Sequence, residues 1–492
     1  MYIIIMKMNN GQNRNLISFK EDELIAQKGT YAPLVDAMRR YKENPCTGFH
    51  IPGHNRGQGV YADFASLMGI DALNIDTTDE FDNLGTLFPS TGAIDEAQRL
   101  ASDVFGSKRT FFLTGGSTIA NLALAFALTK PNDKIAIGRN CHRSVLSGMI
   151  ISGANPKWIM PKKLDDWAIY GSLDAKSLRK CLEDDPDISL VWVTNPTYEG
   201  VVSDIEAISH VCHEFDVALI VDEAHGCLWN FSDVLPKSAL RCGADAVVHS
   251  LHKTGGSMTQ SSMLHISKNS RFDVHKIEHA LKLLHTTSPS LLLLTSLDAA
   301  RAFLSSKEGS TAIENAIDNA LYFRSEASKI DGVRVLNSQS AVAFDVTKIF
   351  LKVDGLSGKR LESILELDFQ IEIESASDEG ILILSNIGNT KAEFDVLLDA
   401  LRKISISNYP DLAYLEGIKF MPLTAPSVVM TPREAYFSKK ERIKKEDAIG
   451  RICAEVIALC PPGISVLLPG ELITESHMPY LSDFSELDVL VK

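Results

Sequence analysis

The sequence predicts an α/β protein built on a three-layer, mainly parallel sheet. Between about residues 92 and 266, short apolar runs alternate with segments whose apolar residues recur at helical spacing. One run, 110–114, leads through two glycines into an apolar helix. Another run ends at Asp222, and Lys253 follows 31 positions later, which leaves room for one helix and one further strand. Strands that alternate with helices in this way are typical of a parallel sheet covered on both faces.

Each expected element follows from its local pattern, in chain order. A helix near 92–105 has apolar residues one turn apart, from Ile94 to Val104, and the strand 110–114 comes next. The following helix, 119–128, is almost wholly apolar and is therefore expected to be buried. Further strands are expected at 133–137, 188–194, 217–222, 245–249 and 262–266, with helices at 144–152 and from Ile205 onward. These elements make a large domain over residues 91–330.

Three other regions complete the predicted organisation. Residues 1–90 form an N-terminal segment. Residues 331–409 form a small α+β domain with strands expected at 332–336, 343–353 and 381–384. Residues 410–492 form a C-terminal domain, in which the clusters 432–437, 461–463 and 469–471 are expected to be loops because of their prolines and glycines.

The composition indicates a large soluble protein and disfavours several classes of partner. The chain has 492 residues, a formal net charge of −14 and 45% hydrophobic residues, enough for two or three domains. The excess of acids disfavours nucleic-acid binding, which needs clustered Lys and Arg. No apolar run approaches the roughly 20 residues of a membrane helix. We expect a cytoplasmic protein, or alternatively an organellar one, because the first twenty residues carry three basic residues and no acid.

The eight cysteines are dispersed and include no Cys-x-x-Cys pair. Neither a zinc site nor a redox centre is therefore expected, and the thiols are expected to be reduced and mostly buried.

Gly115, Gly116, Ser117 and Thr118 lie where the strand 110–114 meets the helix 119–128. The unpaired amides of a helix N-terminus, the small glycines and the two hydroxyls together favour a bound phosphate. The commoner role of a serine in this position is to cap the helix, and Ser117 can do both.

Lys253 and Asp222 indicate which phosphate compound binds there. A lysine amine can bond covalently to the aldehyde of pyridoxal 5'-phosphate, and a strand-end carboxylate can pair with the protonated ring nitrogen, which makes the ring an electron sink. Alone, the run Ser250-Leu251-His252-Lys253 is more typical of a solvated turn, and Asp222 of a helix cap or strand end. Their occurrence together, downstream of the phosphate site, favours pyridoxal phosphate.

Several ordered motifs strengthen this interpretation. They are 49–54 (Phe-His-Ile-Pro-Gly-His), 116–118, 139–144, 196–200 (Pro-Thr-Tyr-Glu-Gly), 222–226 (Asp-Glu-Ala-His-Gly), 250–260, and the C-terminal Pro-Arg-Glu-Ala and Pro-Gly-Glu segments. The series resembles the Orn/Lys/Arg decarboxylase family, whose members have the aspartate-aminotransferase fold of pyridoxal-phosphate enzymes, fold type I. The resemblance runs from about Pro33 to Glu475. It is strongest to the short biosynthetic arginine decarboxylases, since a receiver-like domain before these motifs is not seen.

The resemblance implies roles for the matching residues. Lys253 carries the cofactor and is displaced by the substrate amine, and Asp222 pairs with the ring nitrogen. His142 stacks on one face of the ring, with Ala224 on the other. His225 lies near the reacting centre and assists proton delivery or substrate orientation. The remaining contacts to the cofactor phosphate or edge are Gly116, Ser117, Thr118, Ser250 and His252.

The implied reaction is decarboxylation of a basic amino acid without a metal. Arginine, giving agmatine and carbon dioxide for polyamine biosynthesis, is favoured over lysine and ornithine. Another fold-type-I enzyme, such as an aminotransferase or a carbon-sulfur lyase, stays open, although it needs a carboxylate clamp that the motifs do not identify. A catalytically silent regulatory paralogue is a third hypothesis. For the distal end of the substrate, Glu471 and the stretch 79–82 are plausible acceptors, but solvated loop carboxylates are the more usual interpretation.

The resemblance also implies a homodimer or a larger homo-oligomer. Residues 1–90 then contribute to the dimer and to the mouth of the site. Thr287 and Ser288, within 286–290, resemble a segment that reaches the cofactor phosphate of a partner; the alternative is a capped loop before a helix that begins near Leu291. Asn55 and Leu291 replace a lysine and an aromatic residue that are frequent in the family, and 85–88 match loosely. These departures concern specificity more than cofactor chemistry.

Overall fold

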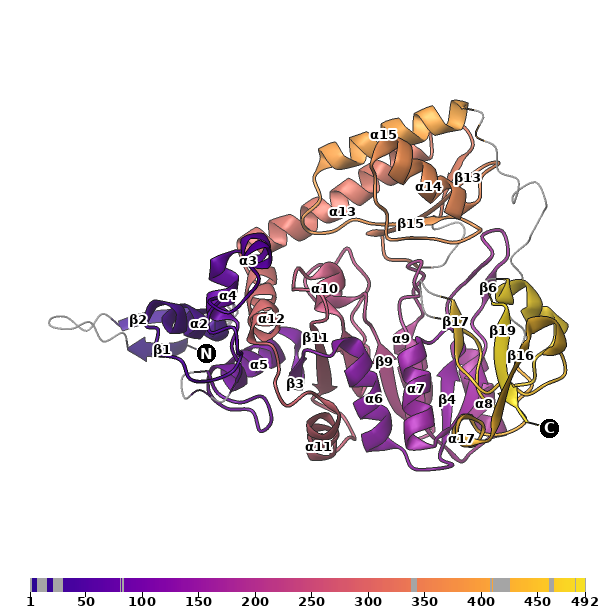
Figure 1. Ribbon diagram of the computed structural model, residues 1–492, viewed down its shortest axis with the longest axis horizontal. Coiled ribbons are helices and arrows are strands. Elements are labelled where there is room, and N and C mark those ends of the chain that lie inside the picture. Colours follow the sequence, from indigo (N-terminus) through magenta and orange to yellow (C-terminus); the bar gives the residue numbers. More distant parts are fainter. Residues whose placement is uncertain are drawn as a thin grey trace.

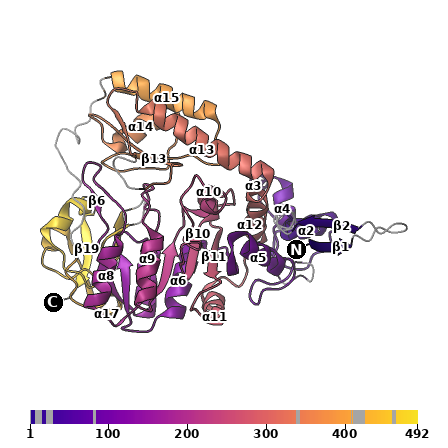
Figure 2. The same ribbon diagram turned by 180° about the vertical axis from the view of Figure 1, so that it is seen from behind.

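The protein is described by a computed structural model that covers residues 2–6, 16–20, 30–79, 81, 84–337, 343–407, 409, 425–459, 464–482 and 484–491, with the backbone alone for the first two ranges. A central sheet carries helices on both faces (Figure 1). A smaller sheet with its own helices lies over one set of strand ends of the central sheet (Figure 1). The N-terminal helices lie beside one end of the central sheet and the C-terminal strands beside the other (Figures 1 and 2).

The central sheet confirms the predicted mainly parallel α/β architecture. Its strands are, in spatial order, β3 (Ser107–Leu113), β11 (Ser262–Ser267), β10 (Ala246–His249), β9 (Ala218–Asp222), β8 (Ile188–Thr194), β4 (Lys134–Gly138) and β5 (Asn155–Ile159). Only the pairings of β11 with its two neighbours are antiparallel. β5 was not predicted. It contains Pro156 and lies at the edge, the position that tolerates a proline.

Both faces of this sheet are buried, because successive strand residues point to opposite sides. In β9, Ile220 packs in the core beneath α6 (Gly116–Leu128), α7 (Arg143–Ser152) and α11 (Val274–Leu284). Leu219 and Val221 pack in the core beneath α8 (Ala175–Asp184) and α9 (Ile205–Glu214). The predicted three layers are therefore helices, sheet and helices.

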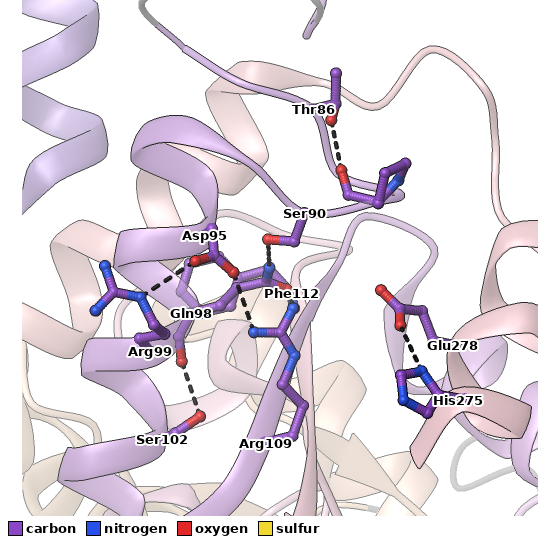
Figure 3. Close-up of polar contacts among 11 residues, drawn as sticks. Thr86, Ser90, Asp95, Gln98, Arg99, Ser102, Arg109, Phe112, His275 and Glu278 are labelled. Atoms are coloured by element: carbon purple, nitrogen blue, oxygen red, sulfur yellow. Dashed lines mark hydrogen bonds and ion pairs between the residues drawn. The ribbon is translucent and has the colours of Figure 1, made fainter. Parts of the chain in front are cut away.

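Helix α5 (Gly92–Phe105) protects the outer edge of β3, as Figure 3 shows. The side chain of Gln98 is fully buried; its Oε1 accepts from Phe112 N at 2.8 Å, and its Nε2 donates to Ser90 Oγ at 2.7 Å. Asp95, on the same helix, pairs with Arg99 and with Arg109 of β3. The edge amide of Phe112 is thus paired, and these contacts hold α5 against the strand that leads into the glycine turn.

The small sheet is antiparallel, in the order β12 (Val333–Val335), β13 (Lys348–Val353), β15 (Ile381–Leu384) and β14 (Ser375–Ala376). It packs with α14 (Gly358–Phe369), α15 (Lys391–Ile406) and the second half of α13 (Lys307–Ala327). The strand predicted to start at 343 begins only at Lys348. Before it, Asp345 Oδ1 accepts hydrogen bonds from both the amide and the hydroxyl of Thr347, which forms a turn.

Helix α13 belongs to two cores. Ile313 and Ile317 pack with α12 (Leu291–Leu304) and the N-terminal helices, whereas Phe323 packs in the small domain. The divisions expected at residues 90, 330 and 409 remain predictions, and residue 410 lies outside the described residues.

The remaining elements lie at the two ends of the molecule or join larger ones. They are β1 (Tyr2–Met6), β2 (Leu16–Lys20), α2 (Pro33–Glu43), α3 (Ala62–Met68), α4 (Ile70–Ile75), β6 (Lys163–Leu164), β7 (Ile169–Tyr170), η1 (Cys227–Asn230), α10 (Leu251–Thr254), α17 (Pro432–Phe437), β16 (Lys440–Lys444), η2 (Lys445–Asp447), β17 (Ile457–Leu459), β18 (Ile464–Leu467), η3 (Glu475–Leu481) and β19 (Glu486–Leu490). None of the helices in the described ranges is long and apolar enough to cross a membrane.

One C-terminal cluster differs from the prediction. Residues 432–437 were expected to be a loop but form α17, because Thr431 and Glu434 make a capping box around Pro432. Pro469 and Gly470 form a turn, as expected. The cluster 461–463 lies outside the described residues.

Candidate active site

A cavity of about 330 Å³ lies at the carboxyl ends of β8, β9 and β10. In open parallel sheets this edge is where ligands bind, and the volume suits a small molecule. All predicted site residues except Thr287 and Ser288 line it: Gly116, Ser117, Thr118, His142, Asp222, Ala224, His225, Ser250, His252 and Lys253. The residues predicted from the sequence therefore surround one cavity. They come together because the strand ends bring residues that are far apart in the chain to the same side of the sheet.

The N-terminus of α6 forms one wall of this cavity. Gly115 is its N-cap residue, and Gly116 has a φ of +69°, a conformation that favours glycine. The alternative role of Ser117, capping the helix, is not seen, because the helix has already begun at Gly116 and has no side-chain cap. Ser117 Oγ instead lies 2.6 Å from Ser250 Oγ, on the turn before α10. Amides and hydroxyls from two segments thus converge, which is the donor set that a phosphate requires.

Asp222 forms the opposite wall, at the end of β9. Its carboxylate is 3% exposed and accepts from Ala224 N and from Asn121 Nδ2, at 3.2 and 2.9 Å. No ion pair joins it to a basic side chain in the described part of the chain. A buried carboxylate is costly without a cation. A ligand with a protonated ring nitrogen, as in pyridoxal phosphate, therefore fits this wall.

Asn121 connects Asp222 to His142. Its Nδ2 also donates to Ser144 Oγ at 2.9 Å, and Ser144 Oγ lies 2.8 Å from His142 Nδ1. The amide of Ser144 donates to the same Nδ1, so Nδ1 is an acceptor and the ring proton is on Nε2. Burial lowers the pKa of His142, which favours the neutral ring. Asn121 was not predicted as a site residue, although a lone polar side chain in the apolar run 119–128 is a local signal for it.

Removing this amide is expected to weaken cofactor binding. Asn121→Ala takes a hydrogen bond from the Asp222 carboxylate, and such a bond contributes about 1.5–3 kcal/mol. The dissociation constant of pyridoxal phosphate, measured by fluorescence titration of the apoprotein, should rise roughly 10- to 150-fold. The exposed Asn269→Ala is the matched control. Equal affinities in the two variants would refute the role of Asn121.

Lys253 projects from α10 toward His225. Its Nζ lies 2.9 Å from His225 Nε2. Burial lowers the pKa of Lys253, although the Asp222 and Glu374 carboxylates act in the opposite direction. Burial, with two lysines nearby, holds the pKa of His225 well below its usual value. A neutral imidazole therefore adjoins an amine that loses its proton more readily than an ordinary lysine, as a nucleophile requires.

Most of the chain that builds this cavity is similar to known proteins. The family model for the Orn/Lys/Arg decarboxylase major domain matches residues 32–354, and that for the C-terminal domain of the same family matches residues 417–490. The chain belongs to the Orn/Lys/Arg decarboxylase family. The predictions of this family, of its carboxy-lyase class and of its fold are thus confirmed, and membership implies the use of pyridoxal phosphate.

Individual members of the Orn/Lys/Arg decarboxylase family cover nearly the whole chain. The arginine decarboxylase of Bacillus subtilis (strain 168) is 36% identical over 464 residues, 93% of this chain and 94% of that protein. The lysine decarboxylase LdcA of Pseudomonas aeruginosa is 24% identical, over 91% of this chain and 75% of that one. The crystal structure of the Francisella novicida lysine decarboxylase LdcF has the same fold, with a TM-score of 0.82 at 21% identity, covering 94% of this chain and 82% of that one.

Glu471 does not have the place expected of it in this decarboxylase. It is 2% exposed and forms a two-fold hydrogen-bonded ion pair with Arg139, at 2.7 and 2.9 Å. It is therefore neither a solvated loop carboxylate nor a free acceptor for substrate. Asp79 is also buried, and its carboxylate accepts from Leu87 N at 3.0 Å. Glu80 and Asp82 lie outside the described residues.

The segment 286–290 does not reach the cavity of its own chain. Thr287 and Ser288 are exposed, and Ser290 caps α12, which begins at Leu291 as predicted. His285 Nε2 accepts from Thr114 N at 3.1 Å, so the segment starts next to the end of β3. The proposed contact with a partner's cofactor is compatible with this exposure but stays a prediction.

Tyr198 and Lys348, near the cavity, were also not anticipated as site residues from the sequence. Tyr198 lines it, and its hydroxyl donates to Glu374 Oε1 at 2.7 Å. Lys348 lies directly behind His225, with its Nζ 3.0 Å from His225 Nδ1. A lysine in a strand buried along its whole length is unusual, and this was the available signal.

Proposed function

We propose that this chain decarboxylates arginine to agmatine and carbon dioxide. The observation that carries the proposal is the 36% identity to the Bacillus subtilis arginine decarboxylase over 464 residues, against 24% to the Pseudomonas aeruginosa lysine decarboxylase. A planar guanidinium and a compact ammonium need different arrays of acceptors, so arginine and lysine decarboxylases are expected to differ in the residues that bind the distal end of the substrate. The greater similarity to arginine decarboxylases therefore favours arginine as the substrate.

The proposed cofactor is pyridoxal 5'-phosphate, and the cavity offers a partner for each of its parts. The α6 N-terminus with Ser117, Thr118 and Ser250 suits the phosphate, and Asp222 suits the ring nitrogen. His142 and Ala224 suit the two faces of the ring, and His252 its edge. When bound, pyridoxal phosphate supplies an electron sink for the pair released as the carboxylate leaves.

The protein residues supply covalent attachment and proton control. Lys253 is the amine that holds the cofactor and is displaced by the substrate amine. His225 Nε2, beside Lys253 Nζ, is placed to hold a proton at the reacting centre. Tyr198 and Ile464 also line the cavity.

A cytoplasmic homodimer is part of the proposal. Exposed apolar side chains in the N-terminal segment, among them Phe49 (96% exposed) and Leu67 (83%), support a subunit interface. The exposed Thr287 and Ser288 would then reach the phosphate of the partner's cofactor.

Substrate choice is tested by incubating the protein and pyridoxal phosphate separately with L-arginine, L-lysine and L-ornithine. We expect carbon dioxide and agmatine from arginine, with kcat/KM at least about tenfold above the other two, which corresponds to about 1.4 kcal/mol of discrimination. Preference for lysine or ornithine would refute arginine while keeping the reaction class. No carbon dioxide from any of the three would refute the decarboxylase proposal, and formation of a keto acid would favour an aminotransferase.

A further inference from the structure

Lys348 is a buried cation behind the cavity wall. It is the first residue of β13 and is 1% exposed. Its strand can approach because residue 200 is a glycine with a φ of +97°; a Cβ there would lie 2.8 Å from Lys348 Cβ. Arg324, also buried, donates to the Lys348 carbonyl and fixes the backbone. This packing brings Lys348 Nζ to His225 Nδ1, at 3.0 Å.

His225 therefore lies between two lysines, since its Nε2 is 2.9 Å from Lys253 Nζ. A neutral imidazole has one N–H and one acceptor nitrogen, whereas an ammonium only donates. Both contacts are hydrogen bonds only if the lysine that faces the ring N–H is a neutral amine, which can accept, while the other lysine donates to the unprotonated ring nitrogen. The geometry thus allows two states, which differ in the ring nitrogen that carries the proton.

The surroundings of Lys348 favour the ammonium there. Its Nζ lies 5.2 Å from the centroid of the Tyr198 ring, a cation–π contact. The buried Asp345 carboxylate, held by Trp229 Nε1 at 2.8 Å, attracts the same charge. Burial is the main cause that lowers the pKa of Lys348 to about 8; a positive charge on Lys253 would lower it too, a contribution that is absent when Lys253 is the neutral partner. The carboxylates of Asp345, Glu374 and Glu199 raise it. The ring of Tyr198 and the Asp345 carboxylate therefore favour the ammonium form of Lys348.

We propose that Lys348 is a positioning residue that donates to His225 Nδ1 and so places the ring proton on Nε2, facing Lys253 and the cavity. The Nε2–H then donates to the neutral Lys253 amine and holds it in place for reaction. Before any ligand binds, the proton-bearing side of His225 already faces the reacting groups. The effect of this tautomer on turnover rests on the proposed function, whereas the tautomer of His225 itself does not depend on it.

The test reads the tautomer without cofactor or substrate. The apoprotein is labelled with ¹⁵N-histidine, and long-range ¹H–¹⁵N spectra are recorded between pH 6 and 8, with His225→Asn to assign the signals. We expect a protonated Nε2 and an unprotonated Nδ1 for His225. A proton on Nδ1 would overturn the proposal, because Lys253 would then be the donor.

Variants of β13 separate positioning from packing. Lys348→Met should mix the two tautomers of His225 and raise its pKa, because a neighbouring positive charge is lost. Lys352→Met is the matched control, since Lys352 is also buried in β13 but pairs with Glu379 at 3.1 Å. Lys348→Arg keeps a donor and should restore the Nε2 tautomer. A His225 signal in Lys348→Met identical to that in Lys352→Met would overturn the proposal.

The rate gives an independent measurement. Decarboxylation by Lys348→Met should fall roughly 10- to 100-fold relative to Lys352→Met, the scale for losing a hydrogen bond between a charged group and its partner. Equal rates in the two variants would overturn the role in turnover. If the wild-type protein decarboxylates none of the three amino acids, the proposed function fails, but the tautomer result stands or falls by itself.

Discussion

Lys253→Ala is expected to lower the rate of arginine decarboxylation by on the order of 10³-fold or more. A positioned proton-transfer group alone contributes about 10²- to 10⁴-fold, and Lys253 is also the proposed point of covalent attachment. The cavity itself should persist, because Ser250 and His252 are fixed by Ser117 and by the Ser261 carbonyl, not by Lys253. The variant should therefore fold and still bind pyridoxal phosphate, but non-covalently.

Covalent trapping tests this directly. After borohydride reduction and proteolysis, wild-type protein should carry the cofactor on the peptide that contains Lys253, and Lys253→Ala should carry none. Lys282→Ala, at an exposed lysine of α11, is the control and should behave as wild type. Cofactor fixed to another lysine in Lys253→Ala would overturn the assignment of the site.

The pH dependence of trapping follows from the burial of Lys253. Burial lowers the pKa of Lys253 from its ordinary value, so the neutral, reactive amine is present at lower pH than for an exposed lysine. Desolvation therefore increases the fraction of neutral Lys253 amine at a given pH.

The catalytic end of the site could be predicted from the sequence because it depends on local signals. Asp222 ends an apolar strand, Ser117 lies in the first turn of a helix that follows a strand-to-glycine pattern, and Lys253 follows a strand end. Each such signal fixes a residue at the same sheet edge, whatever the rest of the fold. The capping role left open for Ser117 beside phosphate binding is not seen, because α6 begins one residue earlier, at Gly116.

The contacts between domains could not be predicted in this way. Arg139 and Glu471 are 332 positions apart, and neither has a local pattern that names the other. Lys348 comes to His225 from a different sheet, across 123 positions. Pairing of this kind is decided by how domains pack, which periodicity does not encode. Helix α17 is a different case, because the Thr-Pro-Arg-Glu run at 431–434 is a capping box that local reasoning can recognise.

The pair of Arg139 and Glu471 leads to the largest expected effect on stability. Both side chains are 2% exposed, and Arg139 also donates to the Val466 carbonyl and lies over the Trp158 ring, 4.6 Å from its centroid. Glu471→Ala leaves the guanidinium buried without its partner, which should cost about 3–5 kcal/mol. Burial raises the pKa of Glu471, but the Arg139 charge opposes this shift. Each charge therefore offsets part of the cost of burying the other.

The loss should appear first where the C-terminal domain meets the large domain. Arg139 lies three residues before His142, whose backbone forms a bridge with Ile464 of β18. Ile464 also lines the cavity. Glu471→Ala should therefore lower the temperature of the first calorimetric transition, increase hydrogen exchange in 464–482, and weaken binding of pyridoxal phosphate.

Two comparisons make the expectation specific. The pair of Arg442 and Glu486 has side chains 66% and 51% exposed, so Glu486→Ala should cost no more than about 1 kcal/mol. The double variant Arg139→Met, Glu471→Leu removes both charges and should recover most of the stability, because an apolar pair avoids the penalty of an unpaired buried ion. If Glu471→Ala is no less stable than Glu486→Ala, the buried pair does not hold the domains together. If instead the double variant is stable but still binds the cofactor weakly, the pair positions His142 in addition to stabilising the interface.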